Sequence, residues 1–190
     1  TLEPQQTEEL QLRVVPFSGR DDVDEAGLEQ RESAVKRWRD RLARVEVPGN
    51  RLFERVLESN VRDIASFPLL DGPSDEWLAM QAGMPLYPAL FGRDTLSAGW
   101  QAAFLDRGES LSASLTRLGR MQSDRDDAWR DAEPGRLVHE VRLGPLARLG
   151  RHPLDAYYGD YAGPLMFVIS LAHLYAWTGD LACVRRHWDT

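Results

Sequence analysis

The sequence predicts an all-α fold with a few short strands in its loops. Several segments repeat apolar residues every three or four positions, which is the period of a helix with one buried face. Residues 163–177 are apolar nearly all the way round, which is typical of a helix buried on all sides. Glycine, proline and short polar runs separate these segments.

The first 24 residues have no helical period. Residues 10–17 alternate apolar and polar side chains, so we expect residues 1–24 to be a linker or the end of a preceding β domain. A helical pattern begins near Glu25. Its apolar residues are Leu28, Val35, Trp38, Leu42 and Val45. Pro48 and Gly49 should end this helix.

A second helix should follow Asn50, which is a good N-cap residue. Its apolar side chains form one broad stripe and end before Pro68. They are Leu52, Phe53, Val56, Leu57, Val61 and Ile64. Residues 76–81 are expected to form a short strand that leads into the next segment.

Residues 82–104 join an extended loop to a helix. Met84 and Tyr87 each precede a proline, which disfavours helix there. After a turn at Gly92, we expect Asp94 or Thr95 to cap a helix whose apolar face holds Leu96, Trp100, Ala103 and Phe104.

The loop would present Arg93 and Asp94 at the start of that helix. Arginine offers forked donors and aspartate only acceptors, a combination that suits a polyhydroxylated ligand. The alternative is that Asp94 only caps the helix and Arg93 pairs with a surface acid. The local sequence by itself favours this alternative.

The next helix starts near Gly108 and should bury Leu111, Leu115, Leu118 and Met121. The link before it is very short, so the two helices should pack as an antiparallel pair. Residues 123–164 are mostly irregular, with one alternating segment at 137–143, and a loop of this length is usually functional. Gly179 should end the apolar helix, and Asp180 should open a last short one.

Composition excludes several classes of protein. The chain has 190 residues and a net charge of -7, which argues against a nucleic-acid binder. No apolar run reaches the ~18 residues of a membrane span. The single cysteine, Cys183, excludes an internal disulfide and should be a small buried apolar residue. We expect an intracellular, cytoplasmic protein with no cofactor and no metal.

Five motifs occur in order along the chain. They are Gly83-Met84-Pro85 with Phe91-Gly92-Arg93-Asp94-Thr95, residues 127–140, Tyr157-Tyr158-Gly159, Pro164-Leu165-Met166-Phe167, and Trp177-Thr178-Gly179-Asp180. Together they resemble the amylo-α-1,6-glucosidase family, the glucosidase part of glycogen-debranching enzymes, which is similar to glucoamylases. The likeness covers residues 48–190. The chain departs from it after Gly159, where many relatives have a longer run with the acid further along.

The resemblance implies a partial (α/α)6 toroid in residues 25–190, truncated at its C-terminus, with the site where loops converge at one end. It implies an inverting glycoside hydrolase that acts on α-glucosidic bonds of an α-glucan or small α-glucoside. It matches substrate-binding roles to Arg93, Asp94, Trp129, Glu133, Glu140, Tyr158 and Asp160. The acid and base would lie beyond Thr190, and the isolated chain would be inactive.

Alternatives stay open at this stage. An inverting enzyme needs two carboxyl groups ~6.5–9.5 Å apart, and nothing in this segment singles out two of its many acids. His139 could be a base, although a lone histidine on an alternating strand is more often structural. The chain could instead be a non-catalytic helical scaffold for carbohydrate or protein binding. An incomplete ring would also leave the apolar helix uncovered, so we expect the isolated chain to be marginally stable, to aggregate, or to form a homodimer through that face.

Overall fold

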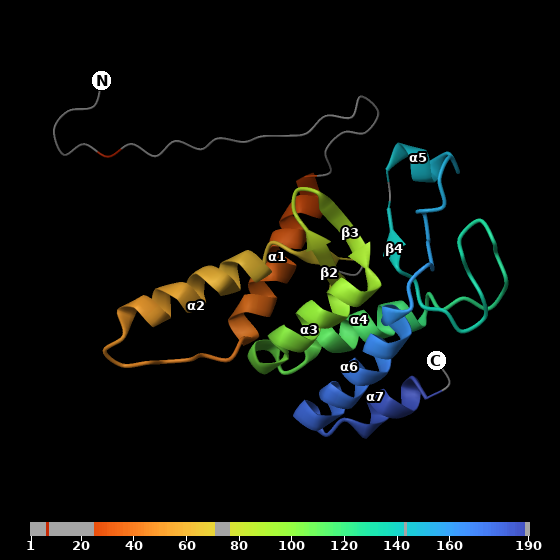
Figure 1. Ribbon diagram of the computed structural model, residues 1–190. Coiled ribbons are helices and arrows are strands. Elements are labelled where there is room, and N and C mark those ends of the chain that lie inside the picture. Colours follow the sequence, from red (N-terminus) through yellow and green to blue (C-terminus); the bar gives the residue numbers. More distant parts are fainter. Residues whose placement is uncertain (1–6, 8–24, 71–76, 143, 189–190) are drawn as a thin grey trace.

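The computed structural model describes residue 7 and residues 25–70, 77–142 and 144–188. Helices predominate, and four short strands form one small antiparallel sheet (Figure 1). The described chain is therefore mixed, with more helix than strand, and the strands are more organised than the sequence predicts. The possible strand at residues 10–17 lies outside the described residues.

Helix α1 (Glu25–Arg41) attaches to the body of the protein through a few polar contacts. The indole of Trp38 is buried and its Nε1 donates to Asp106 Oδ2 at 3.3 Å. Arg31 donates to the carbonyl of Pro68, and Arg41 forms an ion pair with Glu109. The helix ends at Arg41, earlier than predicted, so Leu42 and Val45, which were expected to continue its apolar face, lie beyond it.

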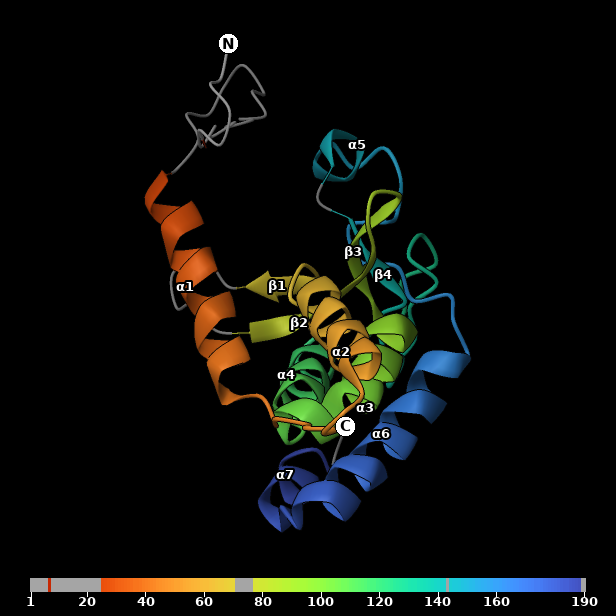
Figure 2. The ribbon, with the colours of Figure 1, turned by 90° about the vertical axis from the view of Figure 1, so that its left-hand side faces the viewer.

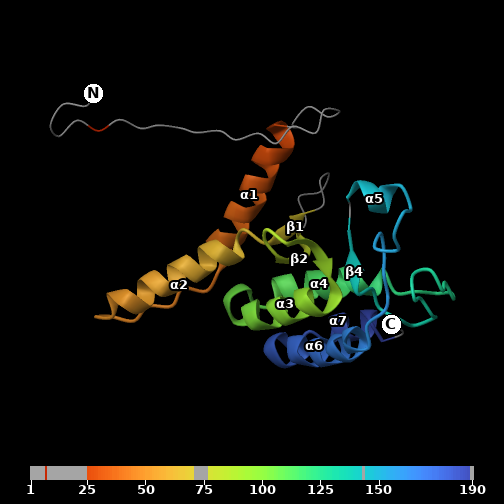
Figure 3. The same ribbon diagram turned by 45° about the horizontal axis from the view of Figure 1, so that its top comes forward.

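Helix α2 (Arg51–Ile64) has the predicted start but not the predicted burial. The side chain of Asn50 accepts a hydrogen bond from the amide of Phe53, which confirms the N-cap. None of the helix's described residues is buried, and Leu52 is 74% exposed. The apolar stripe is present, but α2 extends away from the body of the protein (Figure 3), and the stripe is not buried.

The sheet has the strand order β1 (Pro68–Leu70), β2 (Trp77–Gly83), β3 (Tyr87–Phe91) and β4 (Glu140–Val141). The first three strands are consecutive in the chain, whereas β4 comes from the long loop and pairs Val141 with Leu90. Residues 76–81 were predicted as a strand, and β2 confirms this. The alternating segment 137–143 is a strand only at Glu140–Val141, and Leu143 lies outside the described residues.

Helices α3 (Gly92–Asp106) and α4 (Glu109–Gly119) form the predicted antiparallel pair. A side chain at Gly99 would meet the backbone of Leu111 at 3.0 Å, so glycine permits this close approach. The core of the protein forms around the pair. Its buried members include Leu90, Leu96, Leu111, Leu115, Leu118, Leu137, Val138, Phe167, Leu174 and Cys183.

Helix α6 (Ala162–Thr178) runs parallel to α3 (Figure 1). The ring of Trp100 stacks on His173 at 4.3 Å, and Gly108, just after α3, lies against Leu174 near the end of α6. At the other end, Gly163 lies against Leu137. The two helix N-termini therefore share one end of the body, where the long loop lies.

Helix α6 is not buried on all sides in the described chain, in agreement with the expectation that part of this apolar helix would stay uncovered. One face packs on α3 and α4 through residues such as Phe167 and Leu174, whereas Leu165 and Val168 are about two-thirds exposed. Trp100 and Phe104 of α3, predicted to be in the buried face, are also partly exposed. Among the described elements, α6 packs mainly on α3, α4 and α7 (Leu181–Arg186), and these cover only one face of it.

None of the helices in the described parts of the chain is both long and apolar enough to cross a membrane. The short helix α5 (Pro145–Arg148) lies within the long loop, beyond β4 (Figure 2). Gly179, with a φ of 67°, ends α6, and Asp180 caps α7 by accepting from the amide of Cys183. Both sequence predictions are confirmed, and Cys183 is buried as expected.

Candidate functional site

The candidate site is the junction between β3 and α3, where the long loop docks. The amide of Gly92 donates to the carbonyl of His139 at 2.8 Å. A side chain at Gly92 would come within 2.3 Å of the Val138 carbonyl oxygen. Only glycine therefore lets the start of α3 lie this close to residues 138–139.

The predicted cap of α3, Asp94 or Thr95, is wrong because the helix begins three or four residues earlier, at Gly92. Its N-cap is Phe91, which has no side-chain oxygen, and Asp94 lies within the first turn. Thr95 is fully buried, and its Oγ1 accepts from the amide of Met80 and hydrogen-bonds to Ser114 at 2.8 Å. The hydroxyl thus joins β2 to the helix pair and does not cap the helix.

Arg93 and Asp94 stand at the exposed start of α3. Arg93 is exposed and Asp94 half-buried. Within the described residues, neither side chain forms a hydrogen bond or an ion pair. The alternative from the sequence, in which Arg93 pairs with a surface acid, is not what the described chain shows. Asp94 is favourably placed at a helix N-terminus, where a carboxylate is stabilised by the helix dipole.

A row of aromatic rings follows the junction. Tyr87 contacts Phe91, Phe91 contacts His139, and His139 contacts Tyr157, each edge to face with ring centres 5.7, 5.8 and 6.2 Å apart. The guanidinium of Arg142 lies over the Phe91 ring at 5.4 Å. The rings come from β3 and from two parts of the long loop, and they give the junction apolar faces beside its charges.

Glu140, the first residue of β4, is buried and pairs with Arg142, which follows the strand. Its Oε2 accepts from Arg142 Nε at 2.7 Å. The neighbouring Tyr157 donates through its hydroxyl to Asp131 at 2.6 Å, and the Asp131 carboxylate raises the pKa of that phenol. Glu140 was predicted as a site residue, whereas Tyr157 and Asp131 were not. The bridge between Glu140 and Tyr157 joins their polar contacts into one group.

Asp160 lies beside His139 and at the N-terminus of α6. Its Oδ1 accepts from the amide of Ala162, while Oδ2 lies 3.5 Å from His139 Nδ1. These last two atoms are buried, and neither has a hydrogen-bond partner within the described chain. Asp160 therefore links the long loop to the start of α6, and the imidazole of His139 is the ionisable group nearest to its carboxylate.

The remaining predicted residues lie further out on the loop. Trp129 is 57% exposed on the turn between Asp127 and Ala132. Glu133 is exposed and pairs with Arg136 at 2.9 Å. The hydroxyl of Tyr158 donates to the carbonyl of Met121, which fastens the loop to the end of α4.

Arg130 holds the two arms of the loop together. Its guanidinium pairs with Asp127 at 2.8 Å and with Asp155 at 2.7 Å. These hydrogen bonds are the main reason why the pKa values of both carboxyls are lowered. Both acids therefore have a structural role, and neither is free to act on a ligand.

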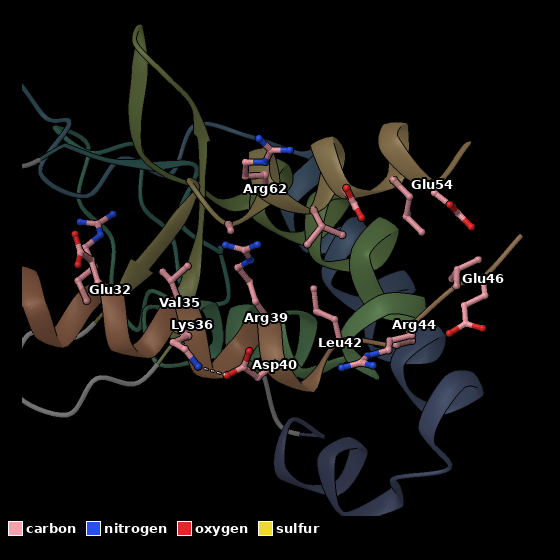
Figure 4. Close-up of a pocket in the computed structure, with 17 residues that line it drawn as sticks. Glu32, Val35, Lys36, Arg39, Asp40, Leu42, Arg44, Glu46, Glu54 and Arg62 are labelled. Carbon is pink, nitrogen blue, oxygen red and sulfur yellow. Dashed lines mark hydrogen bonds and ion pairs between the residues drawn. The ribbon is translucent and has the colours of Figure 1, made fainter. Parts of the chain in front are cut away.

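A groove of about 1310 Å³ lies elsewhere, between α1 and α2 (Figure 4). Its apolar residues include Val35, Leu42 and Leu57, and its rims are charged. Arg39 points from α1 toward α2, and Lys36 pairs with Asp40 on α1. None of the residues predicted to bind substrate lines this groove.

The sequence prediction missed several residues at the junction. The roles of Phe91, Tyr157, Asp131 and Arg142 were not predicted, although the first three lie within the motifs named above. Pairing of β3 with β4, together with the bridge between Glu140 and Tyr157, brings these segments together, and the alternation near Glu140 was the signal of a strand there. Cations, acids and aromatic faces at one junction suit a ligand with many hydroxyl groups.

Comparisons with known proteins add no relative: no protein-family model matches the chain, and the search of curated proteins found no match.

Proposed function

We propose that this chain is the substrate-binding part of a glycoside hydrolase that acts on α-glucosidic bonds, of the debranching amylo-α-1,6-glucosidase type. The observation that carries the proposal is the position of Arg93 and Asp94. Both residues lie in the first turn of α3, and neither side chain has a hydrogen-bond or ion-pair partner in the described chain. The long loop and the start of α6 lie at the same end of the body. The family resemblance of the sequence is the second support.

The local chemistry agrees with a sugar ligand. A guanidinium donates to hydroxyl and ring oxygens, and a neighbouring carboxylate accepts from hydroxyl groups. Aromatic rings at the same junction offer flat apolar surfaces for the C–H faces of a sugar. In this proposal Arg93 and Asp94 hold the terminal sugar, while Trp129, on its exposed turn, contacts a more distant part of the glucan.

The proposal places the acid and base outside this chain. Glu140 pairs with Arg142, Asp155 pairs with Arg130, and Asp160 bonds to the start of α6, so these acids already have structural partners. The described chain therefore contributes binding, and the water activation and protonation of an inverting mechanism are assigned to later helices of the toroid.

The test is α-glucoside turnover by the full protein that carries this chain, with Arg93→Ala and Asp94→Asn. Each substitution is expected to lower kcat/KM by at least about tenfold, because each removes a charge-assisted hydrogen bond of roughly 1.5–3 kcal/mol. Gln101→Ala, an exposed change two turns further along α3, is the matched control. Near-normal turnover in both site variants would remove the basis of the proposal.

A second candidate is a carbohydrate-binding or protein-binding scaffold with no hydrolytic role. The long loop favours this candidate. The carboxylates of Glu133, Glu140 and Asp155 each pair with an arginine, so they have structural partners and are not free to act as acid or base. Titration with maltooligosaccharides separates the two. Binding that depends on Arg93, without turnover in the full protein, supports the scaffold. Turnover that depends on Arg93 supports the enzyme.

A further inference from the structure

His139 and Asp160 form an enclosed pair where the long loop meets α6. Nδ1 of His139 lies 3.5 Å from Oδ2 of Asp160, and both atoms are buried. A Cβ added at Gly163, in the first turn of α6, would lie 3.6 Å from the same Oδ2, so the helix packs close to this atom. Because described residues already enclose the two atoms, no other segment of the protein can reach them, and each is the nearest partner of the other.

The position of the His139 ring is fixed by its neighbours. Its amide donates to the carbonyl of Tyr157 at 2.7 Å, and its carbonyl accepts from the amide of Gly92 at 2.8 Å. The ring itself lies edge to face with Phe91 on one side and with Tyr157 on the other. These contacts hold the imidazole with Nδ1 toward Asp160.

The carboxylate of Asp160 determines which form of the neutral imidazole is stable. Its Oδ1 accepts from the amide of Ala162 at 2.9 Å, and the N-terminus of α6 favours a negative charge there. A lone pair on Nδ1 of His139 would therefore face a second acceptor, and both buried atoms would stay unpaired. A proton on Nδ1 instead places a donor against Oδ2, and a movement of about 0.5 Å closes the hydrogen bond.

The other ring nitrogen of His139, Nε2, has a different environment. It is not among the buried atoms, and it forms no hydrogen bond or ion pair within the described residues. The His139 side chain is 24% exposed, whereas that of Asp160 is 12% exposed. Gly92, which bonds to the backbone of His139, directly precedes Arg93. The accessible Nε2 therefore belongs to the same junction as Arg93 and Asp94.

We propose that Asp160 is a positioning residue. It holds neutral His139 in the Nδ1–H form, so that Nε2 is an acceptor for a hydroxyl group of the bound sugar. The sugar contact rests on the proposed function, whereas the tautomer does not. Arg93 would then supply donors, Asp94 a charged acceptor and His139 a neutral acceptor at one junction.

The first test is the tautomer of His139 in the full protein that carries this chain. Ring nitrogens labelled with ¹⁵N are observed by NMR at a pH where the imidazole is neutral, and His139→Gln identifies the signals. In the wild type Nδ1 is expected to carry the proton. Asp160→Asn keeps an oxygen for the amide of Ala162 but puts an NH₂ donor in place of Oδ2, so the proton should move to Nε2. Asp126→Asn, an exposed change in the same loop, is the matched control and should leave the tautomer unchanged.

The second test is titration with maltotriose, with binding followed by calorimetry and the Nε2 signal by NMR. The sugar is expected to shift Nε2 of the wild type. Asp160→Asn should raise the dissociation constant by roughly three- to tenfold, which is the effect of losing one hydrogen bond, while Asp126→Asn should not change it.

The outcomes separate the two parts of the proposal. A wild-type proton on Nε2, or an Nδ1–H form that persists in Asp160→Asn, would overturn the positioning role of Asp160. The wild-type tautomer decides this even if the variant does not fold. Binding of maltotriose without a shift of Nε2 would overturn the sugar contact alone. Absence of binding would overturn the proposed function together with the sugar contact, and the tautomer result would still stand.

Discussion

Replacing Gly92 with alanine tests how the long loop is fixed to the start of α3. The new Cβ would lie 2.3 Å from the carbonyl oxygen of Val138, a distance that real Cβ atoms essentially never show. The obstacle is backbone, so no side chain can rotate away. The amide of Gly92 also donates to the carbonyl of His139, so any movement of the loop away from α3 lengthens this 2.8 Å hydrogen bond.

The magnitude follows from the required movement. To reach 3.0 Å, the two backbone segments must separate by about 0.7 Å, in a region where Gly92 and Val138 are both buried. Overpacking a core in this way costs about 1–3 kcal/mol. Loss of one backbone hydrogen bond adds roughly 0.5–1.5 kcal/mol. We therefore expect Gly92→Ala to lower the free energy of unfolding by about 2–4 kcal/mol.

The assay is equilibrium unfolding in urea, followed by circular dichroism. Gly83→Ala is the matched control, because a side chain at Gly83 meets nothing within 4 Å. Amide exchange should show faster opening at Val138 and His139 in the Gly92 variant only. If Gly92→Ala is as stable as Gly83→Ala, the close approach of the loop to α3 is wrong, and so is the site built on it.

Three further predictions concern the core and the charges. Leu115→Ala should cost about 2–5 kcal/mol in unfolding free energy because the side chain is fully buried, whereas Leu86→Ala should cost little. Burial raises the pKa of Asp106, so the folded chain holds this proton more tightly than the unfolded chain. That stabilisation is present below the ordinary value of 3.8 and is lost as pH rises through the raised pKa, a trend that Asp106→Asn should remove from unfolding measured at successive pH values. Arg130→Gln should raise the pKa of its two aspartate partners toward their ordinary value, observed by carboxyl NMR titration. Their stabilising effect should then disappear at a higher pH as the solution is acidified.

Signals that depend on a few neighbouring residues were readable in the sequence. Asn50 and Asp180 cap α2 and α7 through an amide three residues further on, and Gly179 ends α6. The short α3–α4 link predicted the antiparallel pair. Such signals depend on backbone geometry within one turn, and no distant part of the chain changes them.

The tertiary structure decided which face of each helix is buried. Because α6 is apolar on all sides, its pattern could not distinguish the face against Phe167 from the face with Val168, and the position of α3 and α4 made the choice. Thr95, a polar residue expected at the helix start, is buried because a strand amide and Ser114 satisfy its hydroxyl. The pairing of β3 with β4 joined residues about 50 positions apart into one junction, and local patterns carry no information about contacts over such separations.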